Sequence, residues 1–446
     1  MQPSRAYAGY VLFALFAMYT FNYLDRYVLS MLLQPIKQEL GASDTMMGFL
    51  TGPAFAVLYA TAGLPIARLA DRTSRRTILA VCFAIWSAFT AVSGFARSTL
   101  ELALARIGVG IGEAGGAAPA HSLISDYFPP HARARALSVF QLGVYAGTFL
   151  GIYAGGVLAE SIGWRRTFLV AGLPGLALSA VLWLSVREPQ RGTFDATPAG
   201  GAPSLGDAMR TLWALPSFRW LTLGAGLASF AGTGFGTWVP TMFVRVHDMS
   251  LAEVGRTYAW FNVPAAIVGT VLAGWLADRL ARGDARWLLG VAALGVALSL
   301  PFLISICLWP DARTAMLFAI PSGIFGAGWA PAAYTAAQNL VPAPMRATAA
   351  SVLVLSLTLL GQGLGPQVVG LLNDALAPRY GDDAVRYSLV IVLATSLVGA
   401  ALLALAARDY RRDVDALRGA QGGRHKSADA QRGVAERRPE CPSASE

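Results

Sequence analysis

Long apolar runs separated by short polar segments make up most of this 446-residue chain. A helix needs about 20 apolar residues to cross the ~30 Å hydrocarbon core of a bilayer. The pattern predicts an all-α membrane protein with twelve transmembrane helices, at about 8–33, 46–68, 77–96, 99–125, 135–158, 165–187, 217–244, 254–278, 286–308, 314–339, 347–372 and 385–407. The first run is too long for the apolar region of a signal peptide, so we expect it to remain as a span.

A polar stretch rich in Pro and Gly, REPQRGTFDATPAGGAPSLGDAMR, divides the twelve runs into two sets of six. The second run of each set ends in a similar motif, ARLADRTSRR around Asp71 and GWLADRLAR around Asp278. This repetition at about half the chain length predicts two pseudo-symmetric six-helix bundles. We expect an N-terminal six-helix bundle at 1–187, a cytoplasmic linker at 188–216, a C-terminal six-helix bundle at 217–407 and a disordered cytoplasmic tail at 408–446.

Composition supports a membrane location, because 55% of the residues are hydrophobic and 14% are charged, against roughly a quarter charged in soluble domains. The net charge of +9 could suggest a nucleic-acid partner. However, 24 of the 35 Lys and Arg residues fall in segments that face one side if the N-terminus is cytoplasmic. Positive residues accumulate in cytoplasmic loops, so we expect both termini in the cytoplasm and no nucleic-acid partner. Three separated cysteines and four scattered histidines predict neither disulfides nor a metal site.

Four charged residues lie well inside the predicted spans: Asp25 and Arg26 in the first, and Arg106 and Glu113 in the fourth. A charge at the bilayer centre costs at least ~2.5–3.5 kcal/mol, so such residues face a partner or a cavity. Asp25 and Arg106 lie in the same half of the membrane, which predicts an ion pair; a purely structural role for this pair is the alternative. Glu113 lies two turns deeper on nearly the same face as Arg106, with no obvious cation at its depth. We therefore expect Glu113 to bind and release a proton.

The segment ARIGVGIGEAGG, residues 105–116, matches the pattern G-x-G-x-x-G. As a dinucleotide-binding motif this pattern requires a preceding strand and a turn. Here it lies inside a predicted continuous membrane helix, so we assign the glycines to another use. Gly108, Gly112, Gly115 and Gly116 form small-residue patches at which helices can approach closely.

The doubled LADR motif, the twelve runs and the central linker resemble the major facilitator superfamily over about residues 8–407. The segments NYLDRY, RIGVGIGEAGG and SDYFPPHARARALS narrow the resemblance to the Spinster-like branch, which moves lysophospholipids and sphingoid lipids such as sphingosine-1-phosphate. The resemblance implies that Asp25, Arg26, Arg106 and Glu113 form a charge network for proton coupling and substrate handling.

The doubled motif also predicts a cytoplasmic gate. Asp71 and Asp278 lie beside arginines at helix ends, where they can latch the two bundles in one state and release them in the other. An ordinary positively charged loop is the alternative. The complete set of expected gate residues is Asp71, Arg72, Arg75, Arg76, Asp126, Arg135, Asp278, Arg279 and Arg346.

The resemblance implies a central cavity lined by the first, fourth, seventh and tenth spans. Aromatic and Met side chains with a few polar groups suit an amphipathic substrate, whose tail would contact the aromatics and whose headgroup would meet an arginine. Ordinary interfacial aromatics are the alternative. The cavity candidates are Asn22, Tyr23, Gln141, Tyr145, Trp238, Met242, Phe261, Asn262, Tyr334 and Gln338.

These features favour a secondary active transporter, monomeric and without a cofactor, that uses a proton gradient in the bacterial inner membrane. The expected substrate is amphipathic and anionic or zwitterionic, such as a lysophospholipid; a hydrophilic organic anion (a sugar acid or carboxylate) or a drug-like efflux substrate is the alternative. A lipid-acting enzyme is disfavoured because Cys82 and Cys307 have no neighbouring base. An ATP-driven pump is disfavoured because neither Lys37 nor Lys426 completes a Walker A motif.

Overall fold

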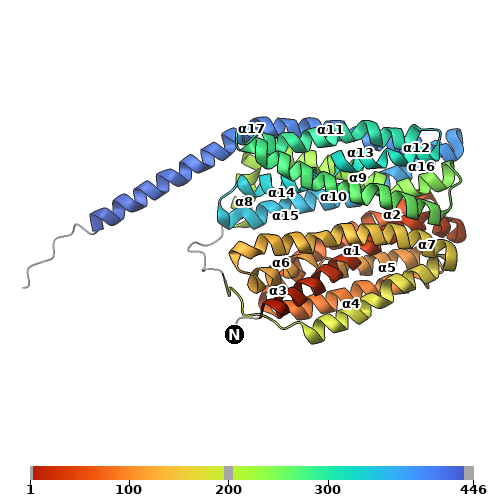
Figure 1. Cartoon of the computed structure of the whole chain (residues 1–446), viewed down its shortest axis with the longest axis horizontal. Coiled ribbons are helices and arrows are strands. Elements are labelled where there is room, and N and C mark those ends of the chain that lie inside the picture. The colour runs from red at the N-terminus through yellow and green to blue at the C-terminus, as the bar shows by residue number, and fades with distance from the viewer. Residues whose placement is uncertain (1–3, 195–203, 436–446) are drawn as a thin grey trace, which may run out of the picture.

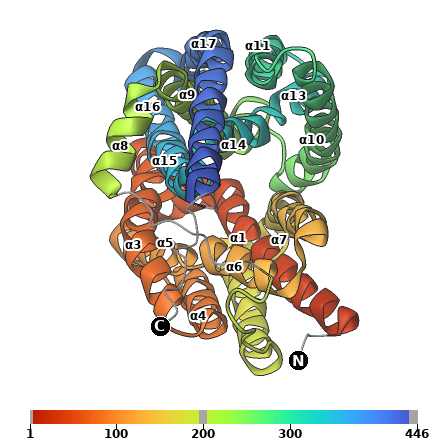
Figure 2. The same ribbon diagram turned by 90° about the vertical axis from the view of Figure 1, so that its left-hand side faces the viewer.

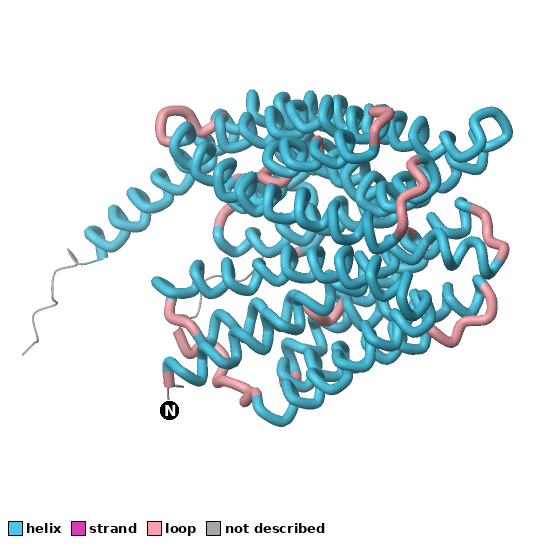
Figure 3. Tube along the Cα trace, turned by 45° about the vertical axis from the view of Figure 1, so that its right-hand side comes forward, coloured by secondary structure: helices cyan, strands magenta, loops and turns pink. Residues whose placement is uncertain are grey.

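The computed structural model describes residues 4–194 and 204–435, and the regular structure in that part of the chain is helical throughout (Figure 3). The helices form two bundles that lie side by side with roughly parallel axes (Figure 1). The first bundle contains α1 (Arg5–Leu40), α2 (Asp44–Thr51), α3 (Pro53–Arg72), α4 (Arg75–Ser93), α5 (Thr99–Glu113), α6 (Ala117–Tyr127) and α7 (Pro130–Ser185). The second contains α8 (Leu205–Ala214), α9 (Pro216–Val246), α10 (Leu251–Ala281), α11 (Trp287–Leu308), α12 (Ala312–Leu317), α13 (Ala319–Gly326), α14 (Trp329–Asn339), η1 (Ala343–Met345), α15 (Arg346–Ser356), η2 (Leu357–Leu364), α16 (Gly365–Tyr380), η3 (Gly381–Asp383) and α17 (Ala384–Ala435).

Seven helical stretches of the described chain are long and apolar enough to cross a membrane. Two of them each hold two of the predicted spans, and both of these stretches turn at a glycine. In α7 the turn is at Gly163, with φ 79°, and before α17 it is at Gly381, with φ 56°. Residues with a Cβ rarely adopt such positive φ values, so glycine is the residue that fits both turns.

Serine begins many of the helices. Ser4, Ser43, Ser74, Ser98 and Ser250 each accept a hydrogen bond from the backbone N–H three residues later. Such an N-cap satisfies a backbone donor that the helix leaves unpaired, and it stabilises the helix by about 1 kcal/mol. The polar residues between the apolar runs therefore fix where several helices start.

The fourth predicted span is not continuous, contrary to the expectation from its apolar pattern. The helix α5 ends at Glu113, and α6 begins only at Ala117. Between them, the N–H groups of Gly115 and Gly116 bond to the carbonyls three residues before, at Gly112 and Glu113. Glycine has a low helix propensity, so the glycines of this segment weaken the helix where it breaks. The break places Glu113 at the end of a helix.

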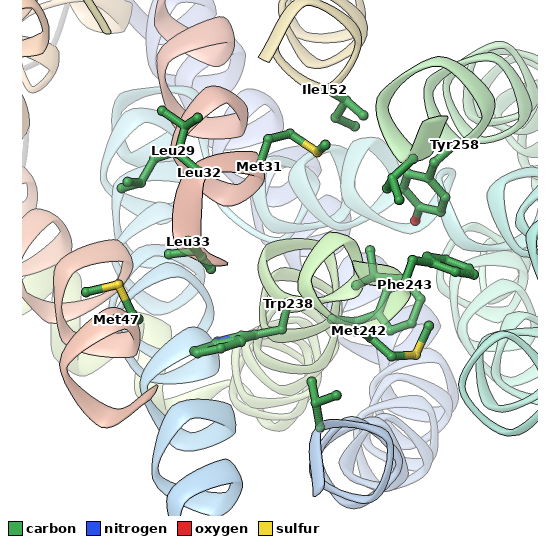
Figure 4. Close-up of a cluster of buried hydrophobic side chains, with 14 of the residues drawn as sticks. Leu29, Met31, Leu32, Leu33, Met47, Ile152, Trp238, Met242, Phe243 and Tyr258 are labelled. Carbon is green, nitrogen blue, oxygen red and sulfur yellow. The ribbon is translucent and has the colours of Figure 1, made fainter. Parts of the chain in front are cut away.

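Buried apolar side chains form three clusters. One cluster, the private core of the first bundle, contains residues of that bundle alone, from Ala8 to Val186. Another, the private core of the second bundle, contains residues of the second bundle alone, from Ala208 to Val414. The third is a shared core in which residues of both bundles interdigitate, including Leu33 and Met47 with Trp238 and Met242 (Figure 4).

The shared core defines a closed end of the molecule. The opposite end carries the start of α1 and the extension of α17, and we name it the terminal end (Figures 1 and 2). At the terminal end each bundle has its own core, so apolar packing joins the two bundles mainly at the closed end.

Two predicted irregular segments contain helix. Within the predicted linker, α8 packs Ala208 and Leu212 into the core of the second bundle; residues 195–203 of that linker lie outside the described part of the chain. The predicted disordered tail begins at 408, but α17 continues to Ala435. An ion pair between Arg411 and Asp415, one turn apart, supports the start of this extension. The reason for the difference is that polar composition alone does not exclude a helix with such pairs.

Candidate functional site: a buried charge network between α1 and α5

Two ion pairs join α1 to α5 inside the first bundle. Arg106 Nη1 lies 2.8 Å from Asp25 Oδ2, and both side chains are almost fully buried. Arg26 holds Glu113 through two nitrogens, with Nε 2.8 Å and Nη2 2.7 Å from Oε2. The contact expected between Asp25 and Arg106 is therefore present. The structure brings all four of the charged residues selected from the sequence into one network.

The expectation that Glu113 has no cationic partner is wrong, because Arg26 pairs with it. Sequence positions give only the depth of the backbone, whereas an arginine side chain extends well along the helix from its own Cα. Side chains also lean toward the N-terminus of their helix. Arg26 can therefore reach a carboxylate that is not level with its backbone.

Aromatic rings surround Arg26. Its guanidinium carbon lies 4.8 Å from the ring centre of Phe55, 5.1 Å from that of Tyr23 and 5.4 Å from that of Tyr59. The guanidinium of Arg106 lies 5.8 Å from the same Phe55 ring. Ring faces attract cations, most strongly where water is excluded. Phe55 of α3 thus contacts the cations of both ion pairs.

Close packing of α5 on α4 sets the position of the two charges on α5. A Cβ on Gly112 would lie 2.6 Å from the backbone nitrogen of Trp86, and one on Gly108 would lie 2.4 Å from ring carbons of Phe89. Glycine at these positions permits the two helices to approach closely, as predicted from the small-residue pattern. A larger side chain would displace α5 and the charges that it carries.

Two polar atoms of the network have no partner in the described structure. Arg106 Nε and Glu113 Oε1 are buried and make no hydrogen bond. Unpaired polar atoms are costly in an apolar interior. Both ion pairs therefore leave one atom available for a further hydrogen bond.

A second set of charges bridges the two bundles at the closed end. Arg245 at the end of α9 donates from Nη2 to Asp44 Oδ1 at 2.7 Å and from Nε to Gln34 Oε1 at 2.7 Å. The carboxylate of Asp374 accepts from the N–H groups of Asp44 and Thr45, at the start of α2. These residues were not predicted from the sequence, because charges at span ends commonly reflect only the topology of the chain in the membrane.

A family model described as the Major Facilitator Superfamily matches residues 15–366. The chain belongs to this superfamily. An MFS-type efflux pump of Mycolicibacterium smegmatis is 35% identical over 92% of this chain and 95% of its own length. The sphingosine-1-phosphate transporter SPNS2 of Danio rerio is 27% identical over 82% of this chain and 76% of its own length. The D-galactonate transporter of Escherichia coli is 28% identical over 87% of this chain and 93% of its own length.

Among solved structures, this major facilitator transporter is similar to a bacterial homologue of the human lysosomal transporter Spinster. The homologue's inward-facing, unoccupied conformation superposes with a TM-score of 0.83 at 32% identity, over 92% of this chain and 99% of that one. Its inward-facing, occupied conformation gives a TM-score of 0.79. The resemblance of the sequence to the Spinster-like branch is thereby confirmed.

At the terminal end of the transporter, the expected gate residues fall into two groups. Asp71, Arg72, Asp278 and Arg279 are exposed, as are Arg135 and Arg346. Arg75 is buried and pairs with Asp126 of the first bundle and with Glu188 at the start of the predicted linker, and Arg76 donates to the carbonyl of Val186. In this structure Arg75, Arg76 and Asp126 contact the start of the linker, and their place in the gate stays a prediction.

The linker residue Glu188 accepts hydrogen bonds from Ser74 Oγ, from Arg75 Nε and from the N–H of Arg76. Burial raises the pKa of Glu188, but these bonds and the charge of Arg75 outweigh it and hold the pKa below its ordinary value. A lowered pKa means that Glu188 stabilises the fold above pH ~4.3 and that this stability is lost as the pH falls through the folded-state pKa.

Replacing Glu188 with glutamine is therefore expected to lower the stability of the first bundle by about 1 kcal/mol at pH 7. The loss should shrink as the pH falls below about 4.3 and through the folded-state pKa, since the wild-type carboxylate becomes protonated over that range as well. Thermal unfolding of purified protein at several pH values measures this. Glu253→Gln, at an exposed carboxylate of α10, serves as the control. An equal loss at every pH would contradict the explanation.

One cavity of about 210 Å³ lies between α1 and the second bundle. Its polar wall consists mainly of Tyr27, Tyr258, Asn262, Ser299, Ser322 and Ser396. Of the predicted cavity residues, only Asn262 is part of this lining. Tyr27 extends the wall to α1, one residue after Arg26. The cavity therefore adjoins the helix that carries the charge network.

The remaining cavity candidates are distributed through the molecule. Trp238 and Met242 are fully buried in the shared core, so their expected place in an open cavity is wrong for this structure. Both side chains pack where the bundles close. Asn22 is buried; Tyr23 contacts Arg26; Tyr145 bonds to Thr270 across the two bundles; Phe261 and Tyr334 are half-buried; and Gln141 and Gln338 are exposed.

Proposed function

We propose that this protein is a secondary active transporter that couples substrate movement to protons by alternating access. The observation that carries the proposal is the pair of ion bridges Asp25–Arg106 and Arg26–Glu113, side by side in the interior of the first bundle. Protonation of either carboxylate neutralises the negative charge of its ion pair. The arginine of that pair can then bind the other carboxylate or an anionic substrate. Such an exchange links proton binding to a change in the contacts of α1 and α5.

Alternating access is supported by the unequal closure of the two ends. The shared core and the Asp44–Arg245 bridge join the bundles at the closed end, and the terminal end has separate cores. We propose twelve membrane crossings, with both termini in the cytoplasm of a bacterial inner membrane. The structure then corresponds to the inward-facing state. Asp71 and Asp278, exposed here, would contact the opposite bundle in the outward-facing state.

We propose an amphipathic anionic or zwitterionic substrate, such as a lysophospholipid or sphingoid lipid. Similarity to SPNS2 and to the Spinster homologue supports this class. The cavity beside α1 combines aromatic rings with serine hydroxyls, which suits a molecule with apolar and polar parts. Similarity to the D-galactonate transporter and to the efflux pump favours the second candidate, a hydrophilic organic anion or a drug-like substrate.

A thermal-shift screen of the purified protein separates these classes. We expect lysophosphatidylethanolamine or sphingosine-1-phosphate to raise the unfolding temperature, because a ligand that binds only the folded state stabilises it. Counterflow in proteoliposomes with the same lipid is then the functional test. Stabilisation and counterflow by D-galactonate, with none by lipids, would replace the proposed substrate class by the second candidate.

A further inference from the structure

Thr90 of α4 contacts the buried ion pair from a third helix. Its hydroxyl oxygen lies 2.6 Å from Asp25 Oδ1 and 2.9 Å from the backbone carbonyl oxygen of Trp86. Thr90 is 2% exposed, and so is Asp25, so water has little access to either contact. Thr90 was not predicted from the sequence, since a threonine in an apolar run commonly bonds to the carbonyl of the preceding turn.

A hydroxyl has one proton to donate but can accept two hydrogen bonds. When Asp25 is ionised, Thr90 must direct that proton to Oδ1 or share it with the Trp86 carbonyl. When Asp25 is protonated on Oδ1, the acid donates to Thr90, and Thr90 is free to donate to Trp86. The observed positions of the three oxygens fit both arrangements. The hydrogen bond between Thr90 and Asp25 can therefore exchange donor and acceptor without a movement of α4.

The partners of Asp25 determine which of its oxygens can hold a proton. Oδ2 faces Arg106 Nη1 at 2.8 Å, and a guanidinium only donates. A proton on Oδ2 would point at another donor. Oδ1 faces Thr90, which can accept. Glu113 differs from Asp25, because its Oε2 faces Arg26 and its Oε1 has no hydrogen-bond partner in the described structure.

We propose that Thr90 is a positioning residue of the charge network, which places the proton of Asp25 on Oδ1 and keeps that side chain bound in both charge states. The proposal rests on the proton coupling proposed above. Thr90 adds a third helix to the coupling site. A change in the protonation of Asp25 on α1 is then transmitted to α4, because it changes the hydrogen bond from Thr90 to the Trp86 carbonyl.

Other charged and titratable groups near Asp25 also affect its protonation. Arg106 on α5 faces it directly, Arg26 on α1 follows it and pairs with Glu113 on α5, and Tyr59 on α3 stacks on Arg26. A substitution at Thr90 leaves all of these in place. Any change in the titration of Asp25 is then attributable to the hydroxyl.

Infrared titration of the protein in lipid nanodiscs tests the proposal without a substrate or a gradient. The carboxylic acid band that Asp25→Asn removes belongs to Asp25. We expect Thr90→Val to move the half-point of that band toward alkaline pH by about one pH unit. The reason is that the ionised form loses a stronger hydrogen bond than the neutral form does. Thr90→Ser, which restores a hydroxyl, should titrate as the wild type does.

Thr222→Val is the matched control, because Thr222 is a buried threonine of α9 whose hydroxyl donates to the carbonyl of Phe218 in the preceding turn. An unmoved half-point in Thr90→Val, or an equal shift in Thr90→Ser, would overturn the proposal. Thr90→Ala replaces the valine variant if that variant does not remain monodisperse. The infrared experiment measures no transport. It therefore tests the role of Thr90 even if the proposed transport function is wrong.

Discussion

Glu113→Gln is expected to reduce proton-driven transport about 100-fold or more. Glutamine keeps the shape of the side chain but leaves the Arg26 guanidinium buried without its counter-ion. Breaking a buried pair in this way costs about 3–5 kcal/mol, and Arg26, 17% exposed, has little water to compensate. The unpaired arginine is then drawn toward Asp25 and holds the network in one charge state. Uptake of labelled lysophosphatidylethanolamine into proteoliposomes, with and without a pH gradient, measures this loss.

Glu101→Gln is the matched control, because Glu101 lies in the exposed first turn of the same helix and caps the N–H of Arg97. We expect that variant to retain wild-type uptake. Counterflow at equal pH on both sides reports whether Glu113→Gln still binds and moves substrate. If Glu113→Gln keeps both the rate and the pH dependence of the wild type, the charge network does not couple protons.

Arg245→Ala is expected to shift the conformational equilibrium about 100-fold toward opening of the closed end. Arg245 is the residue of the second bundle that pairs with Asp44, and the two side chains are 9% and 3% exposed. Removing Arg245 takes away the contacts that tie Asp44 and Gln34 to the second bundle, at a cost of a few kcal/mol to the closed form only. The rate at which a membrane-impermeant maleimide labels Leu33→Cys, in a background without the native cysteines, measures the opening.

Lys37→Ala is the control that distinguishes opening of the closed end from a general loss of charge interactions around Asp44. Lys37 also lies 2.7 Å from Asp44 but belongs to the same bundle, so its removal breaks no contact between the bundles. We expect Leu33→Cys to be labelled slowly in Lys37→Ala and rapidly in Arg245→Ala. Equal labelling rates in the two variants would show that the Arg245 bridge does not hold the closed end.

The sequence was most informative where a charge stood out against an apolar background. Asp25, Arg26, Arg106 and Glu113 were identifiable because a buried charge requires a partner, and the structure joins all four. The actual pairing of Glu113 was not predictable from backbone depth. It depends on the reach of one arginine side chain and on the packing of α3 and α4 around it.

Residues whose contacts depend on the conformation of the protein, or on its fold alone, were less predictable from the sequence. Trp238 and Met242 were expected to line a cavity, but their place depends on which end of the molecule is closed. Asp44 and Arg245 lie at span ends, where charges are common, and only the fold brings them together. Thr90 carries no charge, and one hydroxyl in an apolar run gives no signal. The break after Glu113 was visible only as a high glycine content.

The private cores bear on how the molecule is made. Each is built from one continuous stretch of chain, residues 8–186 and residues 208–414, so neither of these two cores contains residues of the other bundle. The first bundle is synthesised completely before the second begins, and domains generally fold as units in that order. The shared core, which needs residues from both stretches, is then the last to assemble. Interfaces that form last and are built from already folded parts are also the ones that can separate and re-form without unfolding either part.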